Sequence, residues 1–547
     1  MKKWRFITVI LGIGTSYLFL VYNLYNVQIN KNSVYVSKAK SQQSDFLKPN
    51  RGSIYFIDKN NTPAPAVLNK EFPLIYAVPK EIEDVKEAVS ALTPIIGELV
   101  SELEKKLNKP KDLYELLVFK ASDNQVEVVK NLNIKGIYIK NQTSRYYPNN
   151  FLASHVLGFV SPADSSDPKE TFEKGRYGIE AFFEKDLSGK SGETKGDKII
   201  NASDGKDLTL TIDRNIQAEA EEVLKKTIVQ WGAEAGMVIV QEPHSGKILA
   251  MGSFPDFDPN NYSKSDIKNF LNPNVQEVYE SGSASKIFTM AAAFDSGNIT
   301  SETTYTDYGS VTINGRTIEN WDGKAHGKQT MLNVIEKSLN TGAVFAEKQT
   351  GHKTFYKYLL NFGFGEKTSI NLPGELKGSL NNLKNGRDID YAVASYGHGF
   401  SVTPIQLISA ISAIANNGLL MKPLILNDDK PEIVRRVISQ DTSKKVAQMM
   451  VSAVRKNVIA DIPNYNIAGK TATALIPDFK NGGYTEQVIN TYVGFVPAFD
   501  PKFSVLIRID KPKNAPLAGQ TVMPAFKELA EFILNYYNIP PDNLTNN

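Results

Sequence analysis

Ser283 and Lys286, in the segment Ser283-Ala284-Ser285-Lys286, are the residues whose types and spacing best support covalent chemistry. At the start of a helix, side chains three residues apart share a face, so both would line one cleft. The backbone N–H of such a serine also faces outward, ready to stabilise an oxyanion. A serine hydroxyl needs a neighbouring base, and a lysine serves as that base when burial disfavours its charged form. The apolar run from Ile287 to Phe294 predicts a helix able to bury the lysine.

Two later segments carry side chains that complete such a site. Ser338-Leu339-Asn340 offers a serine that can relay a proton and an asparagine that can bind a substrate amide. Lys470-Thr471-Ala472-Thr473 begins a predicted strand, which would bring a lysine and two hydroxyls to the anionic end of a substrate. Each pattern alone is weak, and the serine–lysine spacing also occurs at Ser37, Ser166, Ser203 and Ser265. Their order within one predicted domain favours a shared site for acyl transfer.

The composition excludes several other kinds of site. The 547 residues include no cysteine, which excludes disulfides, thiol nucleophiles, thiolate zinc sites and thiolate-held iron–sulfur clusters. The five histidines do not occur at metal-ligand spacing, so we expect no metal and no cofactor. The 62 basic and 59 acidic residues nearly balance, which gives no reason to expect nucleic acid as a partner.

The N-terminal segment predicts a membrane anchor. No charged residue occurs from Phe6 to Ile29, and the densest apolar stretch runs from Ile7 to Tyr22. A spanning helix needs about 20 mostly apolar residues, and the preceding Lys2, Lys3 and Arg5 keep that end in the cytoplasm. A cleaved signal peptide is the alternative, but no small-x-small cleavage site follows the apolar stretch. We therefore expect an uncleaved single-pass anchor, with the rest of the chain outside the cytoplasm, in the periplasmic space.

The remainder of the sequence predicts two folded parts. Residues 26–206 mix short β-like runs and turns with a helical stretch at roughly 80–130. Residues 207–547 begin with strict alternation and contain a long apolar helix from Thr403 to Ala415. We predict a cytoplasmic tail over 1–5, a transmembrane anchor over 6–25, a stalk and pedestal over 26–206, and a catalytic domain over 207–547. The mixture of elements predicts an α/β (α+β) fold.

Taken in order, these motifs resemble those of the class B penicillin-binding proteins, the monofunctional peptidoglycan D,D-transpeptidases. Ser283 to Lys286, Ser338 to Asn340 and Lys470 to Ala472 are similar to that family's S-x-x-K, S-x-N and K-T-G triplet. Further resemblances occur at Arg51-Gly52-Ser53-Ile54, Arg145-Tyr146-Tyr147-Pro148, Gly178-Ile179-Glu180, Leu210-Thr211-Ile212-Asp213, Phe257-Asp258-Pro259-Asn260 and Gly397-His398-Gly399. The chain looks most like the division-specific type. The resemblance implies a transpeptidase domain with a central antiparallel sheet flanked by helices, preceded by an elongated mixed pedestal (dimerisation-type) domain and one transmembrane helix.

The resemblance also implies the roles of five catalytic residues. Ser283 would be the nucleophile and Lys286 its base. Ser338 would pass the proton onward, Asn340 would bind the substrate amide, and Lys470 would adjust the electrostatics of the network. These roles are expectations carried over from the family motifs onto the matching positions of this sequence.

The third motif implies substrate contacts and contains a departure from the family pattern. Thr471 and Thr473 would hold the terminal carboxylate of the substrate, and the backbone N–H groups of Ser283 and Thr473 would form the oxyanion hole. Ala472 stands where the family usually has glycine, which puts substrate access in question. His398 stands where glutamine is more usual, a change that we expect to be tolerated.

The implied reaction is cross-linking of peptidoglycan stem peptides through a serine acyl-enzyme, in septal wall synthesis at division. The implied partners are stem peptides ending in D-Ala-D-Ala, β-lactam antibiotics, divisome proteins and a membrane-embedded glycosyltransferase of the shape, elongation, division and sporulation family. The alternatives are an elongation-type transpeptidase, a catalytically weak penicillin-binding scaffold, and a serine β-lactamase or carboxypeptidase. Glu336 to Asn340 also spells E-x-x-L-N, a deacylating element of some β-lactamases, but it coincides with the S-x-N segment here. We therefore assign it no hydrolytic role.

Overall fold

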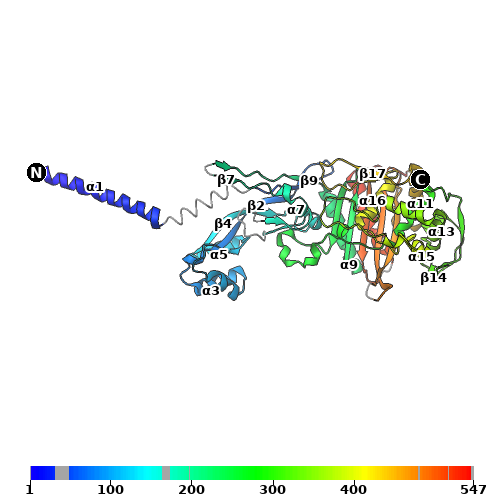
Figure 1. The fold of residues 1–547 in the computed structure, drawn as a ribbon, viewed down its shortest axis with the longest axis horizontal. Helices are drawn as coiled ribbons and strands as arrows, with labels where there is room; N and C mark the ends of the chain where they lie inside the picture. The colour runs from blue at the N-terminus through cyan, green and yellow to red at the C-terminus, as the bar shows by residue number, and fades with distance from the viewer. Residues whose placement is uncertain are drawn as a thin grey trace. The chain divides into compact units, whose positions relative to one another are not determined.

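The computed structural model describes residues 2–30, 49–162, 173–195, 198–478, 481–514 and 517–543 (Figure 1). Contacts divide the chain into two units. One comprises Met1–Gly52, Ala163–Phe172 and Lys185–Lys206, and the other comprises Ser53–Pro162, Glu173–Glu184 and Asp207–Asn547. The elements of the first unit are the helix α1 (Lys2–Tyr25), the π-helical turn η1 (Asn26–Asn30) and the hairpin of β7 (Glu193–Lys195) and β8 (Lys198–Ile200).

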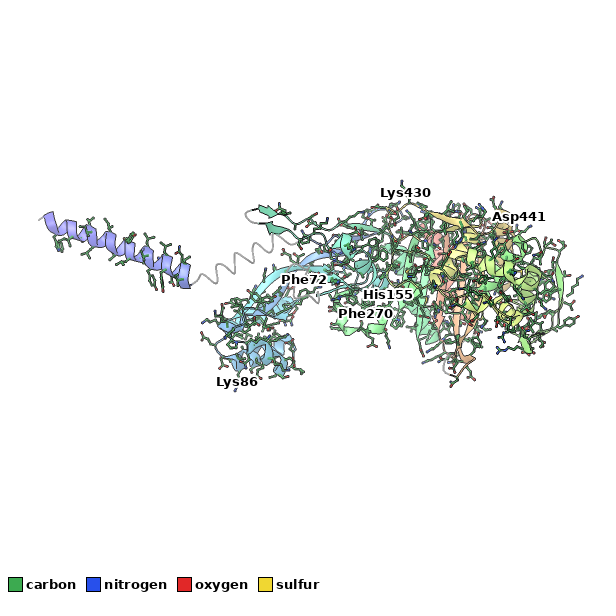
Figure 2. All side chains as sticks on the ribbon, viewed as in Figure 1. Phe72, Lys86, His155, Phe270, Lys430 and Asp441 are labelled. Carbon is green, nitrogen blue, oxygen red and sulfur yellow. The ribbon has the colours of Figure 1, made fainter. Side chains whose placement is uncertain are left out.

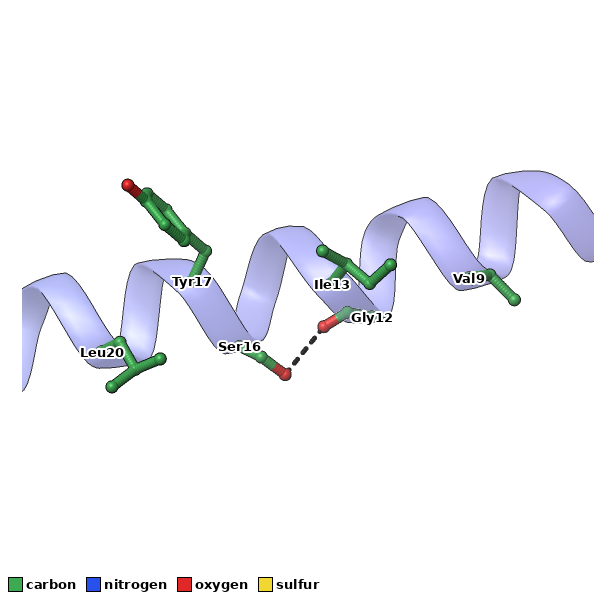
Figure 3. Close-up of a pocket in the computed structure, with 6 residues that line it drawn as sticks. All are labelled: Val9, Gly12, Ile13, Ser16, Tyr17 and Leu20. Atoms are coloured by element: carbon green, nitrogen blue, oxygen red, sulfur yellow. Dashed lines mark hydrogen bonds between the residues drawn. The ribbon is translucent and has the colours of Figure 1, made fainter.

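The helix α1 carries the apolar stretch predicted to be a membrane anchor. Residues Ile7–Ile29 have a mean hydropathy of 1.7 and are long and apolar enough to cross a membrane. Hydroxyl groups on this helix bond to its own backbone: Ser16 Oγ donates to Gly12 O at 2.9 Å (Figure 3), and Thr15 Oγ1 donates to Leu11 O at 2.9 Å. Such internal bonds are required in hydrocarbon, which offers polar groups no partners. The expected apolar helix is present.

A five-stranded sheet organises the pedestal part of the second unit. Its strands follow the order β3-β2-β1-β9, and β4 pairs with β2 along ten residue pairs. The strands are β1 (Ile54–Ile57), β2 (Ala64–Ala77), β3 (Glu115–Val118), β4 (Ile137–Tyr146) and β9 (Leu208–Asp213). The helices packed with this sheet are α3 (Val85–Ile96), α4 (Val100–Leu107) and α5 (Asp123–Leu132). The helical stretch expected at 80–130 is therefore three helices interrupted by the strand β3.

A second five-stranded sheet, fully antiparallel, forms the centre of the catalytic part. Its order is β11-β10-β20-β19-β18, which leaves β18 at an edge. The strands are β10 (Ala235–Gln241), β11 (Ile248–Phe254), β18 (Ala468–Pro477), β19 (Tyr484–Val496) and β20 (Phe503–Asp510). Helices α9 (Arg214–Trp231) and α18 (Ala518–Tyr536) share one apolar core with the sheet. Helix α16 (Pro404–Ala415) also packs against β10, β19 and β20 but contributes nothing to that core, so helices flank the sheet as predicted.

The remaining helices and strands lie outside these two sheets. The helices are α6 (Ser154–Leu157), α7 (Gly178–Phe182), α8 (Glu184–Leu187), α10 (Pro273–Gln276), α11 (Ser285–Asp295), α12 (Met331–Glu336), α13 (Asn340–Thr350), α14 (His352–Asn361), α15 (Asp388–Ala394) and α17 (Gln440–Asn457). The strands are β5 (Val160–Pro162), β6 (Glu173–Gly175), β12 (Thr304–Asp307), β13 (Ser310–Ile313), β14 (Arg316–Glu319), β15 (Gly327–Thr330), β16 (Leu419–Met421) and β17 (Ile433–Arg436).

Several segments singled out in the sequence meet where the pedestal joins the catalytic part. Arg145, at the end of β4, is fully buried and its Nε donates to Glu180 Oε1 at 2.6 Å. Asn260 donates from Nδ2 to Tyr147 O at 2.9 Å, and its Oδ1 accepts from Tyr147 N at 3.0 Å. The ring of His155 packs edge-on against Phe257, which in turn contacts Phe270. His155 and Phe270 are labelled in Figure 2. These motifs of the resemblance therefore form one buried joint.

Candidate active site

Ser283 lies in a short 3₁₀ turn, Gly282–Ala284, that runs directly into α11. The first nine residues of α11, from Ser285 to Ala293, are all buried, and six of them are apolar. Lys286 lies within this buried stretch with no exposed surface, whereas Ser283 is only partly buried. The turn thus presents the hydroxyl while the helix buries the amine.

The amine of Lys286 is surrounded by oxygen atoms of the first two motifs. Its Nζ lies 3.1 Å from Ser283 Oγ, 3.1 Å from Ser338 Oγ and 2.8 Å from Asn340 Oδ1. It also lies 2.7 Å from the backbone oxygen of Ser338. The segments that the sequence places far apart therefore meet around a single amine, at distances suited to proton transfer.

Ser338 is held in an unusual backbone conformation. It follows the end of α12, where Leu339 N donates to Val334 O at 3.0 Å, and its φ is +57°. A residue other than glycine pays about 1–2 kcal/mol for this left-handed conformation. Strain of this kind persists where the surroundings require it, often at functional sites. The conformation directs both oxygens of Ser338 towards Lys286.

The side chain of Asn340, at the start of α13, is fixed on both sides. Its Oδ1 faces Lys286, and its Nδ2 donates to Glu319 O at 2.8 Å. Behind it, Thr341 donates to Asp307 Oδ1 at 2.8 Å, and Asn320 donates to Asp307 Oδ2 at 2.8 Å. This buried network on Asp307 had no signal in the sequence, because its members come from separate segments with no recognisable pattern.

The strand β18 brings the third motif to the same place. Lys470 Nζ lies 3.1 Å from Ser338 Oγ and 2.9 Å from Thr471 O. Side chains alternate along the strand: Lys470 and Ala472 are buried on one face, whereas Thr471 and Thr473 are partly exposed on the other. Ser338 Oγ therefore lies between the two lysine amines.

Burial and mutual repulsion control the charges of the two lysines. Burial, followed by the charge of Lys470, lowers the pKa of Lys286 well below its ordinary value. Burial lowers the pKa of Lys470 to about 8. Neither amine forms an ion pair with a carboxylate among the described residues. The cluster therefore favours a neutral amine at Lys286.

Thr473 makes a contact that the sequence did not predict. Its Oγ1 accepts a hydrogen bond at 3.0 Å from the backbone N–H of Ala518, the first residue of α18. Because a hydroxyl carries one proton and two lone pairs, the proton of Thr473 remains able to donate to a substrate. The hydroxyl is oriented by this bond before any ligand arrives.

A second set of residues missed by the sequence interpretation surrounds Glu280, three positions before the nucleophile. Its carboxylate accepts from Gly399 N at 2.9 Å and from Tyr484 Oη at 3.0 Å, and it lies 2.9 Å from His398 Nδ1. His398 was noted only as a departure from the family pattern. Glu280 and Tyr484 belong to no recognisable motif.

The described residues contain no group of three or more His, Asp or Glu that could hold a metal ion. Glu336, part of the E-x-x-L-N pattern, accepts from Ser452 Oγ at 2.6 Å and pairs with Lys456, both on α17. Its carboxylate is therefore engaged with α17.

Two family models cover most of the chain. The penicillin-binding protein transpeptidase domain matches residues 236–531, which is more than half of the sequence, and the penicillin-binding protein dimerisation domain matches residues 46–218. The chain belongs to the penicillin-binding protein family. The class B membership predicted from the motifs is confirmed, as is the predicted fold class.

Similar proteins of known name extend over nearly the whole sequence. The chain is 31% identical to "Stage V sporulation protein D" of Bacillus subtilis, over 92% of this chain and 81% of that protein. It is 27% identical to "Peptidoglycan D,D-transpeptidase FtsI" of Escherichia coli, over 99% of this chain and 93% of that one.

Solved structures share the fold of this penicillin-binding protein. Penicillin-binding protein 2X from Streptococcus thermophilus superposes with a TM-score of 0.72 at 22% identity, covering 90% of this chain and 80% of that one. A peptidoglycan synthetase from Bifidobacterium adolescentis gives a TM-score of 0.69 at 24% identity, covering 91% and 97%. At these identities the likeness concerns the fold alone.

Proposed function

We propose that this penicillin-binding protein is a serine D,D-transpeptidase that cross-links peptidoglycan stem peptides and is acylated by β-lactams. The observation that carries the proposal is the position of the Lys286 amine. It is buried, with no carboxylate partner among the residues that the structure describes. It lies 3.1 Å from a partly exposed serine hydroxyl and 3.1 Å from a second hydroxyl that leads to Lys470. Family membership and the named D,D-transpeptidases among its relatives support the same reaction.

The first half-reaction forms an acyl-enzyme. Neutral Lys286 takes the proton of Ser283 as Ser283 Oγ attacks the carbonyl carbon of the penultimate D-Ala. The new C–O bond forms and the C–N bond to the terminal D-Ala breaks. The departing amine takes a proton by way of Ser338, whose Oγ lies 3.1 Å from each lysine amine. Lys470 stabilises the negative charge that develops in this network.

The second half-reaction transfers the acyl group to an amine. The amine of a neighbouring stem peptide attacks the ester, the C–O bond to Ser283 breaks, and the oxygen recovers its proton. The backbone N–H groups of Ser283 and Thr473 would stabilise the oxyanion in both halves. Thr471 and Thr473 would hold the terminal carboxylate of the donor. In a β-lactam the broken amide remains tethered to the acyl group, so no leaving group departs.

The geometry does not favour the alternative activities. Hydrolysis requires a base for water, and the carboxylate of Glu336 is engaged by Ser452 and Lys456. A catalytically weak scaffold was considered because of Ala472. The pairing of β18 with β19 nevertheless continues without interruption from Ala468 to Leu475. The Lys286 amine also keeps its contacts with Ser283 Oγ and Asn340 Oδ1, so Ala472 does not disrupt the catalytic geometry.

We further propose a place for the protein in the cell. The helix α1 would anchor it with the N-terminal residues 1–5 in the cytoplasm and the pedestal and catalytic parts (26–206 and 207–547) outside. A role in septal wall synthesis is supported by the similarity to FtsI. Its partners would then be divisome proteins and a membrane-embedded glycosyltransferase of the shape, elongation, division and sporulation family, and an elongation role is the alternative.

Covalent labelling tests the reaction directly. Fluorescent penicillin should label the solubilised wild-type protein in a denaturing gel, and Ser283→Ala should abolish the label while thermal unfolding stays unchanged. The matched control is Ser265→Ala, which removes a serine that shares the S-x-x-K spacing but lies outside the site. Label that persists in Ser283→Ala would reject Ser283 as the nucleophile.

A further inference from the structure

One carboxylate at the edge of the site gathers donors from two distant segments. Glu280 accepts from Gly399 N at 2.9 Å and from Tyr484 Oη at 3.0 Å, and its Oε2 lies 2.9 Å from His398 Nδ1. The side chains of Glu280 and His398 are 12% and 19% exposed, whereas Tyr484 is 44% exposed. Water therefore weakens the bond from Tyr484 more than the contact between Glu280 and His398. Bonds to an ionised group are about twice as strong as neutral ones.

The protons in this cluster can be assigned from the network. Burial, followed by the charge of Glu280, raises the pKa of Tyr484, so its phenol remains protonated and donates. An ionised carboxylate only accepts, so the phenol proton of Tyr484 lies on the bond to Glu280. His398 Nδ1 must then donate the 3.2 Å hydrogen bond that it shares with Tyr484 Oη, and it also lies 2.9 Å from Glu280 Oε2. The rings of His398 and Tyr484 also meet edge to face, with centroids 5.3 Å apart. The three side chains therefore support one another through both bonds and packing.

The cluster connects three segments of the active site. Glu280 stands three residues before Ser283. The loop that carries His398 is bonded to the same segment, because Gly282 N donates to Gly397 O at 3.1 Å. Tyr484 begins β19 and pairs across the hairpin with Pro477, the last residue of β18. The bond from Tyr484 to Glu280 thus connects the far end of β18 to residues 280–283, which we call the nucleophile loop.

Strand β18 also lies close to the nucleophile loop at a second point, beside Gly282. A Cβ added to Gly282, whose φ is +51°, would lie 3.2 Å from Ala474 Cβ, so a side chain here would strain the backbone and press on the strand. The segment of β18 beyond Ala474 is therefore fixed at two points, one beside Gly282 and one at Tyr484. Any ligand group that extends from Ser283 along this segment must fit the width that these two points set.

We propose that Glu280, His398 and Tyr484 form a clasp that sets the spacing between β18 and the nucleophile loop and so selects slim, extended acyl donors. This inference rests on the proposed transpeptidase function. The clasp admits an extended stem peptide and slows acylation by β-lactams with bulky acyl side chains. Its members are positioning residues, because they act through the placement of β18.

The test compares acylation by a compact penicillin and by a bulky oxime cephalosporin, using the full-length protein in detergent. Tyr484→Phe removes one hydroxyl but keeps the ring, and His398→Ala removes a second donor. Each should raise the ratio of bulky to compact acylation rates by about fivefold, the size expected for one lost hydrogen bond. His398→Gln should restore the wild-type ratio, because its amide can donate to Glu280.

A matched control separates the clasp from general loosening of the protein. Tyr138 also donates to a carboxylate, that of Glu81 in the pedestal, so Tyr138→Phe removes a similar bond away from the site. Its ratio should equal that of the wild type. Equal changes with both drugs, or unchanged ratios in both Tyr484→Phe and His398→Ala, would overturn the clasp. Wild-type protein that neither drug acylates would instead reject the proposed function.

Discussion

At the residue scale, the protonation state of Lys286 controls the nucleophile. The neutral amine is the active form, and burial together with Lys470 lowers the pKa of Lys286. The acylation rate should therefore rise with pH through a midpoint well below the ordinary lysine value of about 10.4. Stopped-flow acylation by a penicillin across a pH series measures this midpoint.

An arginine at this position gives an independent check of the base. Lys286→Arg should be nearly inactive, because a guanidinium does not release its proton in proteins. Unfolding of the variant must be followed as a control, since arginine is larger than the buried lysine. A well-folded variant that acylates at a near-normal rate would remove Lys286 from the role of base.

Ala472 is the residue at which the third motif departs from the family. It is 2% exposed and lies on the buried face of β18 from which Lys470 reaches Ser338, opposite the face of Thr471 and Thr473. One extra methyl in a tight contact costs about 1–3 kcal/mol when its surroundings cannot relax. We predict that Ala472→Gly speeds acylation by bulky β-lactams more than turnover of a slim D-Ala-D-Ala substrate.

Acylation rates for small and bulky drugs in both proteins check this prediction. Glycine weakens a strand by about 0.5–1 kcal/mol, so the melting temperature of the variant is the necessary control. If the glycine variant speeds neither reaction, the steric prediction is wrong. The residues around Ala472 are then already packed to accommodate its methyl group.

The sequence predicts residues of this site to different degrees. Ser283, Lys286, Ser338 and Lys470 could be predicted because each lies in a short local pattern, and the structure brings all four within hydrogen-bonding distance. Tyr484 could not, because its bond to Glu280 joins positions 204 residues apart. Only the tertiary fold creates such a contact.

At the element scale, helix α9 carries a carboxyl group that should make stability depend on pH. Glu221 accepts from Ala153 N at 2.9 Å and from Gln217 Nε2 at 2.7 Å. Burial, with a contribution from Asp256, raises the pKa of Glu221 to about 8. The folded protein thus keeps a proton that the unfolded chain releases above about pH 4.3. Stability from this group is therefore present at low pH and is lost as pH rises towards 8.

Replacing this carboxyl tests the linkage. Glu221→Gln should be more stable than the wild type at about pH 9, by about 1–3 kcal/mol, and should lose this advantage at about pH 4. Thermal unfolding at the two pH values measures the difference. Glu222→Gln, at an exposed neighbouring position, is the matched control and should behave as the wild type does at both. A Glu221→Gln advantage that is equal at both pH values would contradict the linkage.

Elements with strong periodicity were predicted well, and short ones were not. The apolar run at Thr403–Ala415 becomes α16, whose residues are all buried. The strand β3, only four residues long, lies inside the stretch predicted as helical at 80–130. Three of its four residues pair with β2 across a long stretch of chain, so a local pattern gives no indication of the strand.

At the scale of the whole molecule, the anchor and the catalytic part should be separable. The unit that contains all site residues excludes α1. A variant lacking residues 1–30 should leave the membrane fraction and keep the wild-type penicillin acylation rate. Fractionation followed by fluorescent penicillin labelling measures both properties. A soluble but unlabelled variant would show that the anchor contributes to the site.

The order in which the chain is made has a bearing on when the site can form. The hydroxyl of Thr473 is oriented by the first N–H of α18, and this helix also supplies Phe526, Leu529 and Ile533 to the core beneath the sheet. The ribosome makes α18 after every other helix described here. We therefore expect a nascent chain that has already emerged with Ser283 and Lys286 in place to react poorly with substrate or drug until residues 518–536 have been synthesised and have packed against β18.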